Sequence, residues 1–221
     1  DLIFLGFGTV NGEDGRAFKT RDGGVMRLEN LIAGVNEEVY KKVMSNREME
    51  EDEAKQIAKV VGIAALKYAD LSNQASKDYI FDIDRFTSFE GNTGPYILYT
   101  MVRIKSILAK YKEVCGEVQA DVIAHPFAGA EETREYGQAE IDLMLTVAKF
   151  NDVIASVYGE LAPHKLCQYI YELANTFNSF YHGNKIMSEE DKKKQAGYIG
   201  LVTLTRNVLL TCIDLLGFEA P

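Results

Sequence analysis

Hydrophobic side chains recur every three or four positions along most of the chain beyond residue 27, with polar side chains between them. This period is typical of amphipathic helices, and the runs that suggest strands are short by comparison. Helices are predicted at about residues 28–44, 54–69, 95–114, 131–149, 163–181 and 191–216, a strand at residues 2–7, and a short strand or an extended crossover at residues 79–81. The pattern therefore predicts a mainly α protein, a bundle of helices preceded by a small α/β segment.

Several element ends carry their own signals. Asn92 or Thr93 is expected to cap the helix that begins at Pro95, and Gly217 is expected to end the last helix. The helical pattern after residue 131 is interrupted near residues 150–152.

The first ten residues, from Asp1 to Val10, have the composition of a buried strand that enters a glycine turn. An acidic residue ahead of an apolar run is opposite to the basic start of a secretory signal peptide. Because the chain begins within a predicted strand and without methionine, we expect it to be a fragment of a longer protein.

Composition places the chain among ordinary globular proteins. Its 221 residues are 47% hydrophobic and 26% charged, with a net charge of −9 at pH 7. This balance excludes collagen-like, mucin-like and wholly disordered proteins. No uninterrupted apolar run approaches the roughly 18 residues of a membrane helix, so we expect no membrane association.

The cysteines do not form a metal-binding pattern. Cys115, Cys167 and Cys212 make no Cys-x-x-Cys pair, and the three histidines have no ligand spacing with them. Small, buried thiols in a reducing compartment explain this pattern, and we expect no protein-bound metal.

A glycine-rich stretch at residues 12–23 is the first candidate binding site. Its glycines allow the backbone to approach a phosphate group closely, and Lys19, Thr20 and Arg21 supply donors. The glycine spacing matches neither the Walker loop nor the Rossmann dinucleotide motif. From the residues alone a solvated hairpin loop is the simpler interpretation, and a phosphate site is the alternative.

The second candidate is the segment 92–112, which carries four cationic residues and no acidic one. Tyr96, Tyr99 and Arg103 are three and four residues apart and therefore share one helical face. Aromatic rings beside cations provide a stacking surface and phosphate neutralisation for unpaired nucleotides. A second interpretation stays open, in which the tyrosines are half-buried packing residues and the cations form a solvated face.

The predicted helix at residues 163–181 is mostly a core helix. An apolar stripe runs along it, whereas Asn178 and Tyr181 lie off the stripe, and Tyr181 stands at the helix end where its ring could reach a ligand. The sequence has no nucleophile elbow, no paired acidic motif with metal spacing and no supported His-centred dyad. It therefore offers no complete catalytic arrangement.

Three segments are distinctive in combination. The first joins Gly-Phe-Gly-Thr-Val at residues 6–10 to Phe-Lys-Thr-Arg at residues 18–21. The second contains Tyr-Ala-Asp-Leu at residues 68–71, Lys-Asp-Tyr-Ile-Phe-Asp at 77–82 and Phe-Glu-Gly-Asn-Thr-Gly-Pro-Tyr at 89–96. The third begins Pro-His-Lys-Leu-Cys at residue 163 and ends Phe-Tyr at 181, and Leu-Leu-Gly at 215–217 also fits. Together they resemble the arginyl-tRNA synthetases, a class I family, over nearly the whole chain.

The resemblance implies a division into three regions. Residues 1–26 would be the end of a Rossmann catalytic domain, with a divergent Lys-Met-Ser-Lys-Ser signature loop. Residues 27–72 would form stem-contact helices, and residues 73–221 a helical anticodon-binding domain. In that family the signature loop contacts the phosphates of ATP, so the resemblance makes Lys19 the candidate catalytic residue, which stabilises charge on the leaving pyrophosphate beside Thr20 and Arg21.

The resemblance also implies partners and a reaction. Tyr96 and Tyr99 match the paired tyrosines that meet the anticodon loop, Tyr181 matches a ring near the same loop, and Arg103 adds a cation. The chain would be the C-terminal part of a cytoplasmic, monomeric arginine–tRNA ligase, which joins arginine to tRNA-Arg with ATP and its Mg²⁺ counter-ion. No counterpart of the His-x-Gly-His signature or of the arginine pocket is present, so we expect the chain alone to be inactive.

Two departures from the family pattern limit the expected contacts. Lys185 stands where some eukaryotic members carry a second aromatic residue, and the chain ends at Pro221 where members of the family usually continue to a terminal Met. Two alternatives are open. One is a helical protein-interaction module derived from a synthetase that has no tRNA binding, and the other is a different class I synthetase with a similar helical domain.

Overall fold

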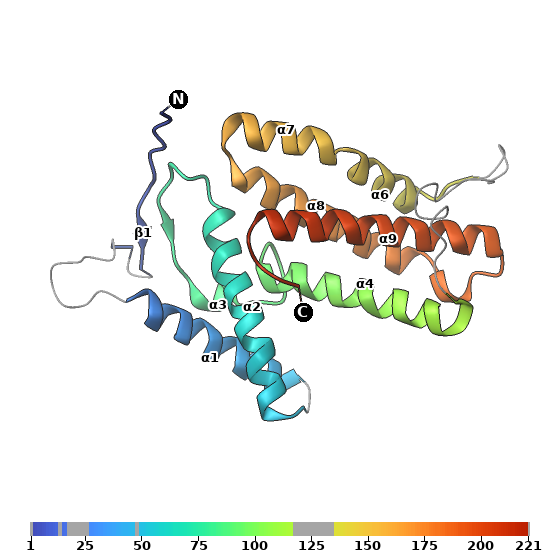
Figure 1. Cartoon of the computed structure of the whole chain (residues 1–221), viewed down its shortest axis with the longest axis horizontal. Helices are drawn as coiled ribbons and strands as arrows, with labels where there is room; N and C mark the ends of the chain where they lie inside the picture. Colours follow the sequence, from blue (N-terminus) through green and yellow to red (C-terminus); the bar gives the residue numbers. More distant parts are fainter. Residues whose placement is uncertain (1, 13–14, 17–26, 47–48, 117–134, 221) are drawn as a thin grey trace.

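The computed structural model describes residues 2–12, 15–16, 27–46, 49–116 and 135–220 (Figure 1). Its longer helices are α1 (Leu28–Asn46), α2 (Glu51–Leu71), α4 (Gly94–Cys115), α6 (Gln138–Ala148), α7 (Phe150–Glu160), α8 (Pro163–Gly183) and α9 (Lys192–Leu215). The shorter elements are β1 (Val10–Asn11), β2 (Tyr79–Ile80), α3 (Ile83–Phe86) and the 3₁₀ turn η1 (Ile186–Ser188). The predicted class, mainly α with a small α/β entry, is confirmed.

Helices α4 and α6–α9 form an elongated bundle, and α8 and α9 contribute most of its core (Figure 1). Ile170, Leu173 and Phe177 of α8 are fully buried, as are Ile199 and Leu209 of α9. By length and composition, α9 is the one described helix that could cross a membrane, yet 67% of its apolar window is buried inside the molecule. The packing of α9 in the bundle accounts for its apolar composition.

Helices α1 and α2 form a hairpin that packs beside the bundle, with α2 crossing the start of α4 (Figure 1). Tyr68 of α2 joins three parts of the molecule, because its buried hydroxyl oxygen lies 2.7 Å from Asn92 Oδ1 and 2.8 Å from the carbonyl oxygen of Cys167. Burial raises the pKa of the Tyr68 hydroxyl well above its usual value, so the group stays neutral.

The turn before α4 has the structure that its local signals predict. Thr93 is the N-cap, since its side chain accepts a hydrogen bond from the Tyr96 backbone N–H. Gly91 has a φ of 80°, which a residue with a Cβ rarely adopts. Gly94 packs directly against the backbone of Ala64 in α2. The close approach of α4 to α2 therefore depends on this glycine.

The two strands pair in parallel, with Val10 opposite Tyr79 and Asn11 opposite Ile80. Further bonds extend the contact, because the Gly8 N–H donates to the Ala75 carbonyl over 2.7 Å and the Thr9 N–H donates to the carboxylate of Asp78 over 2.6 Å. Segments almost seventy residues apart in the chain are thus joined at one edge of the molecule.

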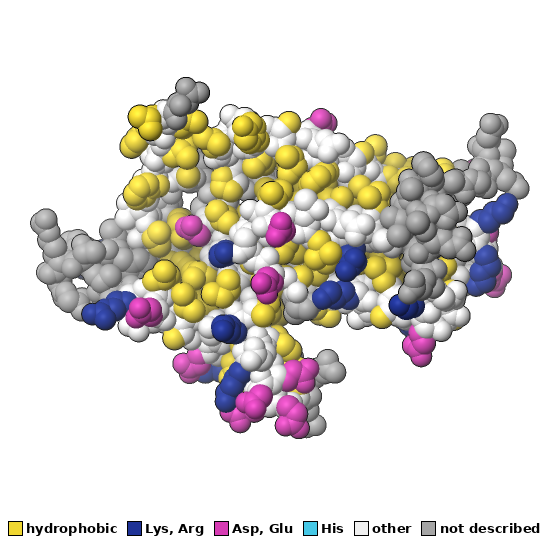
Figure 2. Space-filling model, in the orientation of Figure 1, with side chains coloured by type: hydrophobic (Ala, Val, Ile, Leu, Met, Phe, Trp, Pro, Cys, Tyr) yellow, Lys and Arg dark blue, Asp and Glu magenta, His cyan; other side chains and the backbone are white. Residues whose placement is uncertain are grey.

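The prediction of a buried strand over residues 1–10 is wrong for most of its length. Residues 2–9 do not form a strand, and the side chains of Leu2, Phe4 and Phe7 are almost fully exposed. Figure 2 shows apolar side chains at the N-terminal end of the molecule. A strand needs a neighbouring backbone, and among the described residues only Val10 and Asn11 obtain ladder pairing, from β2.

One helix was missing from the sequence prediction. The expected break near residues 150–152 is only a change of direction at Lys149, which keeps helical backbone angles between α6 and α7. Helix α7 then continues to Glu160 and ends at Leu161 in the left-handed conformation. Val153, Ile154 and Val157 are partly buried and pack against the bundle. Their spacing of three or four positions is that of one face of a helix, which is the signal in the sequence for α7. As predicted, α9 is followed by Gly217, whose φ is 73°.

Candidate nucleic-acid interface

The cation and three of the aromatic rings singled out in the sequence lie together on one side of the bundle. Arg103 of α4 lies between two rings, with its guanidinium carbon 5.0 Å from the centroid of Tyr99 and 5.3 Å from that of Tyr181 in α8. Both distances are within the range of cation–π attraction. The Arg103 guanidinium also donates to the Tyr99 hydroxyl over 3.3 Å.

A polar network behind these rings fixes the arginine. The side-chain oxygen of Asn178 in α8 accepts from Arg103, and its amide nitrogen donates to the Tyr96 hydroxyl over 2.9 Å. The Tyr96 hydroxyl in turn donates to Asn175 over 2.6 Å. The orientation of Arg103 is thus set by contacts across two helices. Helical spacing placed Asn178 off the apolar stripe, but its partners are known only once α4 and α8 are packed.

The three tyrosines differ in what they can present to a ligand. Tyr99 is 49% exposed, so much of its ring is open to solvent. Tyr96 is half-buried, with its hydroxyl occupied and its ring 5.8 Å from that of Tyr171 in an edge-to-face contact. Tyr181 is half-buried too and stacks on Phe177 with an interplanar angle of 17°. Tyr99 is therefore the ring best placed to accept a stacked base, and Tyr96 holds the network behind it.

An open groove of about 800 Å³ runs past Tyr96 and Tyr99, between the α1–α2 hairpin and the bundle. One wall comes from the hairpin and the next segment, with Val43, Ile57 and Phe89, and the opposite wall contains Tyr99 and Arg103. Apolar walls that carry a few fixed polar groups suit a flat heteroaromatic ring. Sequence reasoning did not include the hairpin in the site, because the groove exists only where the hairpin meets the bundle.

Charge is unevenly distributed over the molecule. Glu51, Asp52 and Glu53 start α2, at the tip of the hairpin, where Figure 2 shows acidic side chains gathered. Segment 92–112, in contrast, carries four cations and no acidic residue, and two of these cations, Arg103 and Lys110, are seven positions apart and share one face of α4. The net charge of −9 is therefore compatible with a local basic face.

The residues expected to contact ATP belong to a part of the chain that the structure does not describe. Lys19, Thr20 and Arg21 lie outside the described residues. Among the residues that the structure does describe, no group of three or more His, Cys, Asp or Glu side chains could hold a metal ion. Cys167 and Cys212 are buried, and burial raises the pKa of each thiol to about 12.

The model of the DALR anticodon binding domain matches residues 97–221, which is more than half of the chain, and the model of the catalytic domain of the class I (R) tRNA synthetases matches residues 1–83. The chain belongs to the arginyl-tRNA synthetases. The predicted family is thus confirmed, and the comparisons give no support to the alternative of an interaction module without tRNA binding.

Two curated relatives are arginine–tRNA ligases. The one from Agathobacter rectalis is 57% identical over 229 residues, and the one from Alkaliphilus oremlandii is 52% identical over 220 residues. Both matches cover 100% of this chain, but only 37% and 36% of the relatives. The chain thus spans little more than a third of the length of these arginyl-tRNA synthetases.

Two solved structures share the fold. Arginyl-tRNA synthetase from Thermus thermophilus superposes with a TM-score of 0.78 at 25% identity, and that from Plasmodium falciparum with a TM-score of 0.75 at 26% identity. Each match covers 98% of this chain and 34% of the other. The arrangement of α4 and α8, which carry Tyr96, Tyr99 and Tyr181, therefore belongs to an arginyl-tRNA synthetase fold.

Proposed function

We propose that the chain is the C-terminal part of an arginine–tRNA ligase and that it binds the anticodon loop of tRNA-Arg. The observation that carries the proposal is the arrangement of Arg103 between Tyr99 and Tyr181, beside an open groove. An exposed ring stacks with an unpaired base, and a neighbouring guanidinium adds positive charge for the backbone phosphates. The family membership supports this ligand over another flat molecule.

The site residues have separate roles in this proposal. Tyr99 stacks on a base, Tyr181 contacts the same loop, and Arg103 lies between their rings and attracts the phosphate backbone. Tyr96 acts mainly as a positioning residue, because its hydroxyl is occupied by Asn175 and Asn178. These roles predict that loss of the Tyr96 hydroxyl disturbs Arg103, whereas loss of the Tyr99 ring removes a stacking surface.

The whole protein would attach arginine to tRNA-Arg with ATP, in the cytoplasm and as a monomer. Lys19 would stabilise the charge that develops on the pyrophosphate of ATP, with Thr20 and Arg21 beside it and Mg²⁺ as the counter-ion of the nucleotide. Residues 1–26, 27–72 and 73–221 would be the end of the catalytic domain, the stem-contact helices and the anticodon-binding domain. The chain alone would not form arginyl-adenylate, since no complete catalytic arrangement is found in its sequence.

A binding titration tests the proposal directly. The chain is titrated with a tRNA-Arg transcript and with the same transcript carrying a changed middle anticodon base, at two salt concentrations. We expect a preference for the native anticodon that persists at the higher salt. Equal, weak and steeply salt-dependent binding of both transcripts would show phosphate attraction only and would refute anticodon recognition by this chain.

A pair of tyrosine variants locates the contact. Replacement of one stacked ring by alanine costs about 1–3 kcal/mol, so Tyr99→Ala should raise the Kd by about 5-fold to 150-fold. Tyr158→Ala is the matched control, because Tyr158 is 81% exposed but lies on α7, away from the groove. Equal affinities of the Tyr99 variant and the unmodified chain would rule out Tyr99 as a base contact.

A further inference from the structure

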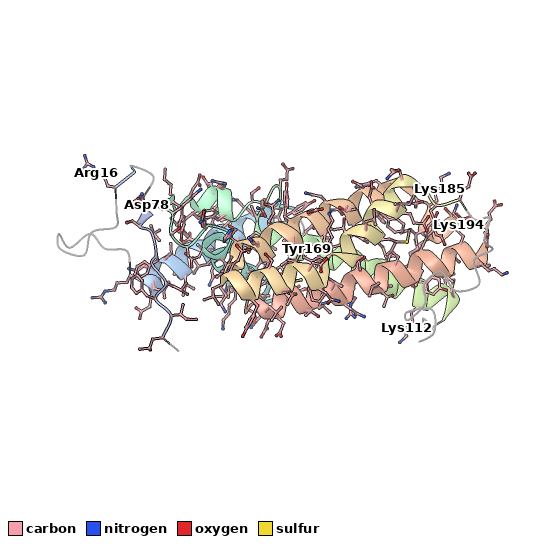
Figure 3. The ribbon with its side chains drawn as sticks, turned by 90° about the horizontal axis from the view of Figure 1, so that it is seen from above. Arg16, Asp78, Lys112, Tyr169, Lys185 and Lys194 are labelled. Carbon is pink, nitrogen blue, oxygen red and sulfur yellow. The ribbon has the colours of Figure 1, made fainter. Side chains whose placement is uncertain are left out.

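A second, smaller hollow adjoins the groove that runs past Tyr96 and Tyr99. It has a volume of about 460 Å³ and is lined by residues of α4, the end of α8 and η1. Arg103 and His182 line both this hollow and the larger groove, so the two are neighbours on one surface. Figure 3 shows Lys185, one of its lining residues, at the opposite end of the molecule from Arg16 and Asp78. The part of the hollow formed by Lys185 thus lies far from Arg16 of the glycine-rich stretch.

The lining of this hollow is cationic. Arg103, Lys110 and Lys185 line it, and none of the described lining residues is acidic. Glu189 follows directly after η1, but its charge is compensated by Lys194 at 3.2 Å. Asn184 and Ser188 add neutral polar groups to the rim. The larger groove differs, since it contains Glu90 and several apolar side chains.

The rim of the hollow is held in place by hydrogen bonds. Gln195 of α9 is only 2% exposed, and its side-chain amide donates to the carbonyls of Ile186 and Met187 over 3.0 and 3.1 Å. Asn184 donates to the Phe180 carbonyl over 2.8 Å at the end of α8. These bonds fix the turn that carries Lys185. The backbone that carries Lys185 is therefore held in place before an anion binds, which lowers the cost of binding.

We propose that this hollow, called the cationic hollow below, binds a backbone phosphate of the RNA strand whose unpaired base stacks on Tyr99. The proposal rests on the proposed function. It adds that the RNA strand occupies two neighbouring sites, the larger groove and the cationic hollow. The apolar groove takes the base, and Lys110 and Lys185 take the phosphate next along the strand. Two flexible ammonium groups suit a phosphate better than a base, because each acts as a point charge and neither offers a flat stacking surface.

Salt dependence of binding measures phosphate contacts separately from base contacts. The probe is an anticodon stem-loop of tRNA-Arg, titrated with the chain between about 50 and about 200 mM salt. Each lost phosphate contact in a single-stranded region lowers the slope of log K against log salt by about 0.7. Lys110→Gln and Lys185→Gln should each lower the slope by up to this amount, so that the affinity lost over this range is about 2.6-fold smaller than in the unmodified chain.

Lys105→Gln is the matched control. The substitution Lys105→Gln removes one positive charge from α4, as Lys110→Gln does. Lys105, however, lies on the side of α4 opposite to the hollow and is absent from its lining. The control variant should keep the slope of the unmodified chain. All three variants should keep the preference for the native anticodon, because no stacking ring is changed.

The possible results separate the two proposals. Lower slopes for Lys110→Gln and Lys185→Gln, with an unchanged slope for Lys105→Gln, would support the phosphate site. Unchanged slopes in all variants, or the same decrease in all three, would overturn it even if the anticodon preference remained. Absence of any anticodon preference in the unmodified chain would overturn the proposed function, and the phosphate site with it.

Discussion

The contact of α4 with α2 at Gly94 predicts that a larger residue at this position destabilises the chain. A Cβ at this position would lie 2.5 Å from the carbonyl oxygen of Ala64 and 2.8 Å from its carbonyl carbon. Both atoms belong to the backbone of α2, so no rotamer change can relieve the clash, and the two helices would have to separate. Overpacking of this kind costs about 1–3 kcal/mol. We therefore expect Gly94→Ala to lower the free energy of unfolding by about that amount.

The matched control is another helical glycine. Gly34 lies inside α1, and a Cβ there would have no neighbour within 4 Å. Because alanine favours helix over glycine by about 0.5–1 kcal/mol, Gly34→Ala should stabilise the chain. The two variants should differ by roughly 1.5–4 kcal/mol in urea unfolding followed by circular dichroism.

Thermal unfolding measures the effect of Gly94→Ala on stability independently. For a chain of this size, about 1–3 kcal/mol corresponds to a decrease in Tm of about 2–12 °C. A Gly94→Ala variant as stable as the unmodified chain, alongside a stabilised Gly34→Ala variant, would refute the close approach of α4 to α2.

Four further predictions concern the cysteines and two hydrogen-bonded side chains. A thiol reagent at neutral pH should modify exposed Cys115 alone in the native chain and all three cysteines after denaturation. Burial raises the pKa values of Cys167 and Cys212 from 9.0 to about 12, so their contribution to stability is complete below pH 9 and is lost as pH rises toward 12. Urea unfolding at pH 8 and pH 10 should reveal this loss, at about 1 kcal/mol per thiol, and Cys212→Ala should reduce it. Tyr68→Phe should cost about 1–3 kcal/mol in the same assay, because the buried carbonyl of Cys167 and the side-chain oxygen of Asn92 lose the hydroxyl that lies between them. Asn178→Ala should raise the Kd for tRNA-Arg by about tenfold in a titration, because Arg103 loses its anchor.

Local signals explain what could be predicted from the sequence. The cap at Thr93, the glycine after α9 and the helical periods all depend on residues close together in the chain, and the structure confirms them. Segments 6–10, 18–21 and 89–96, together with the helix that starts at residue 163, were sufficient to identify the family.

Features that depend on tertiary packing could not be predicted in this way. The exposure of Phe4 and Phe7 is decided by whether a neighbouring strand exists, which the residues themselves do not encode. Asn178 becomes a network residue only when α8 packs on α4. Likewise Lys110 and Lys185 are 75 positions apart in the sequence, and only the folded chain brings them to the lining of one hollow.

The parallel pairing of β1 with β2 has a consequence for the order of folding. The contact between Thr9 and Asp78 closes a loop of 69 residues, and closing a flexible loop of that length has a large entropic cost. Helices α1 and α2 lie within this loop and pack on each other through contacts that are more local in sequence. Once they form, far fewer free residues separate the strands. We therefore expect the α1–α2 hairpin to assemble first and the two-stranded sheet to form late, as the step that ties the N-terminal segment to the rest of the molecule.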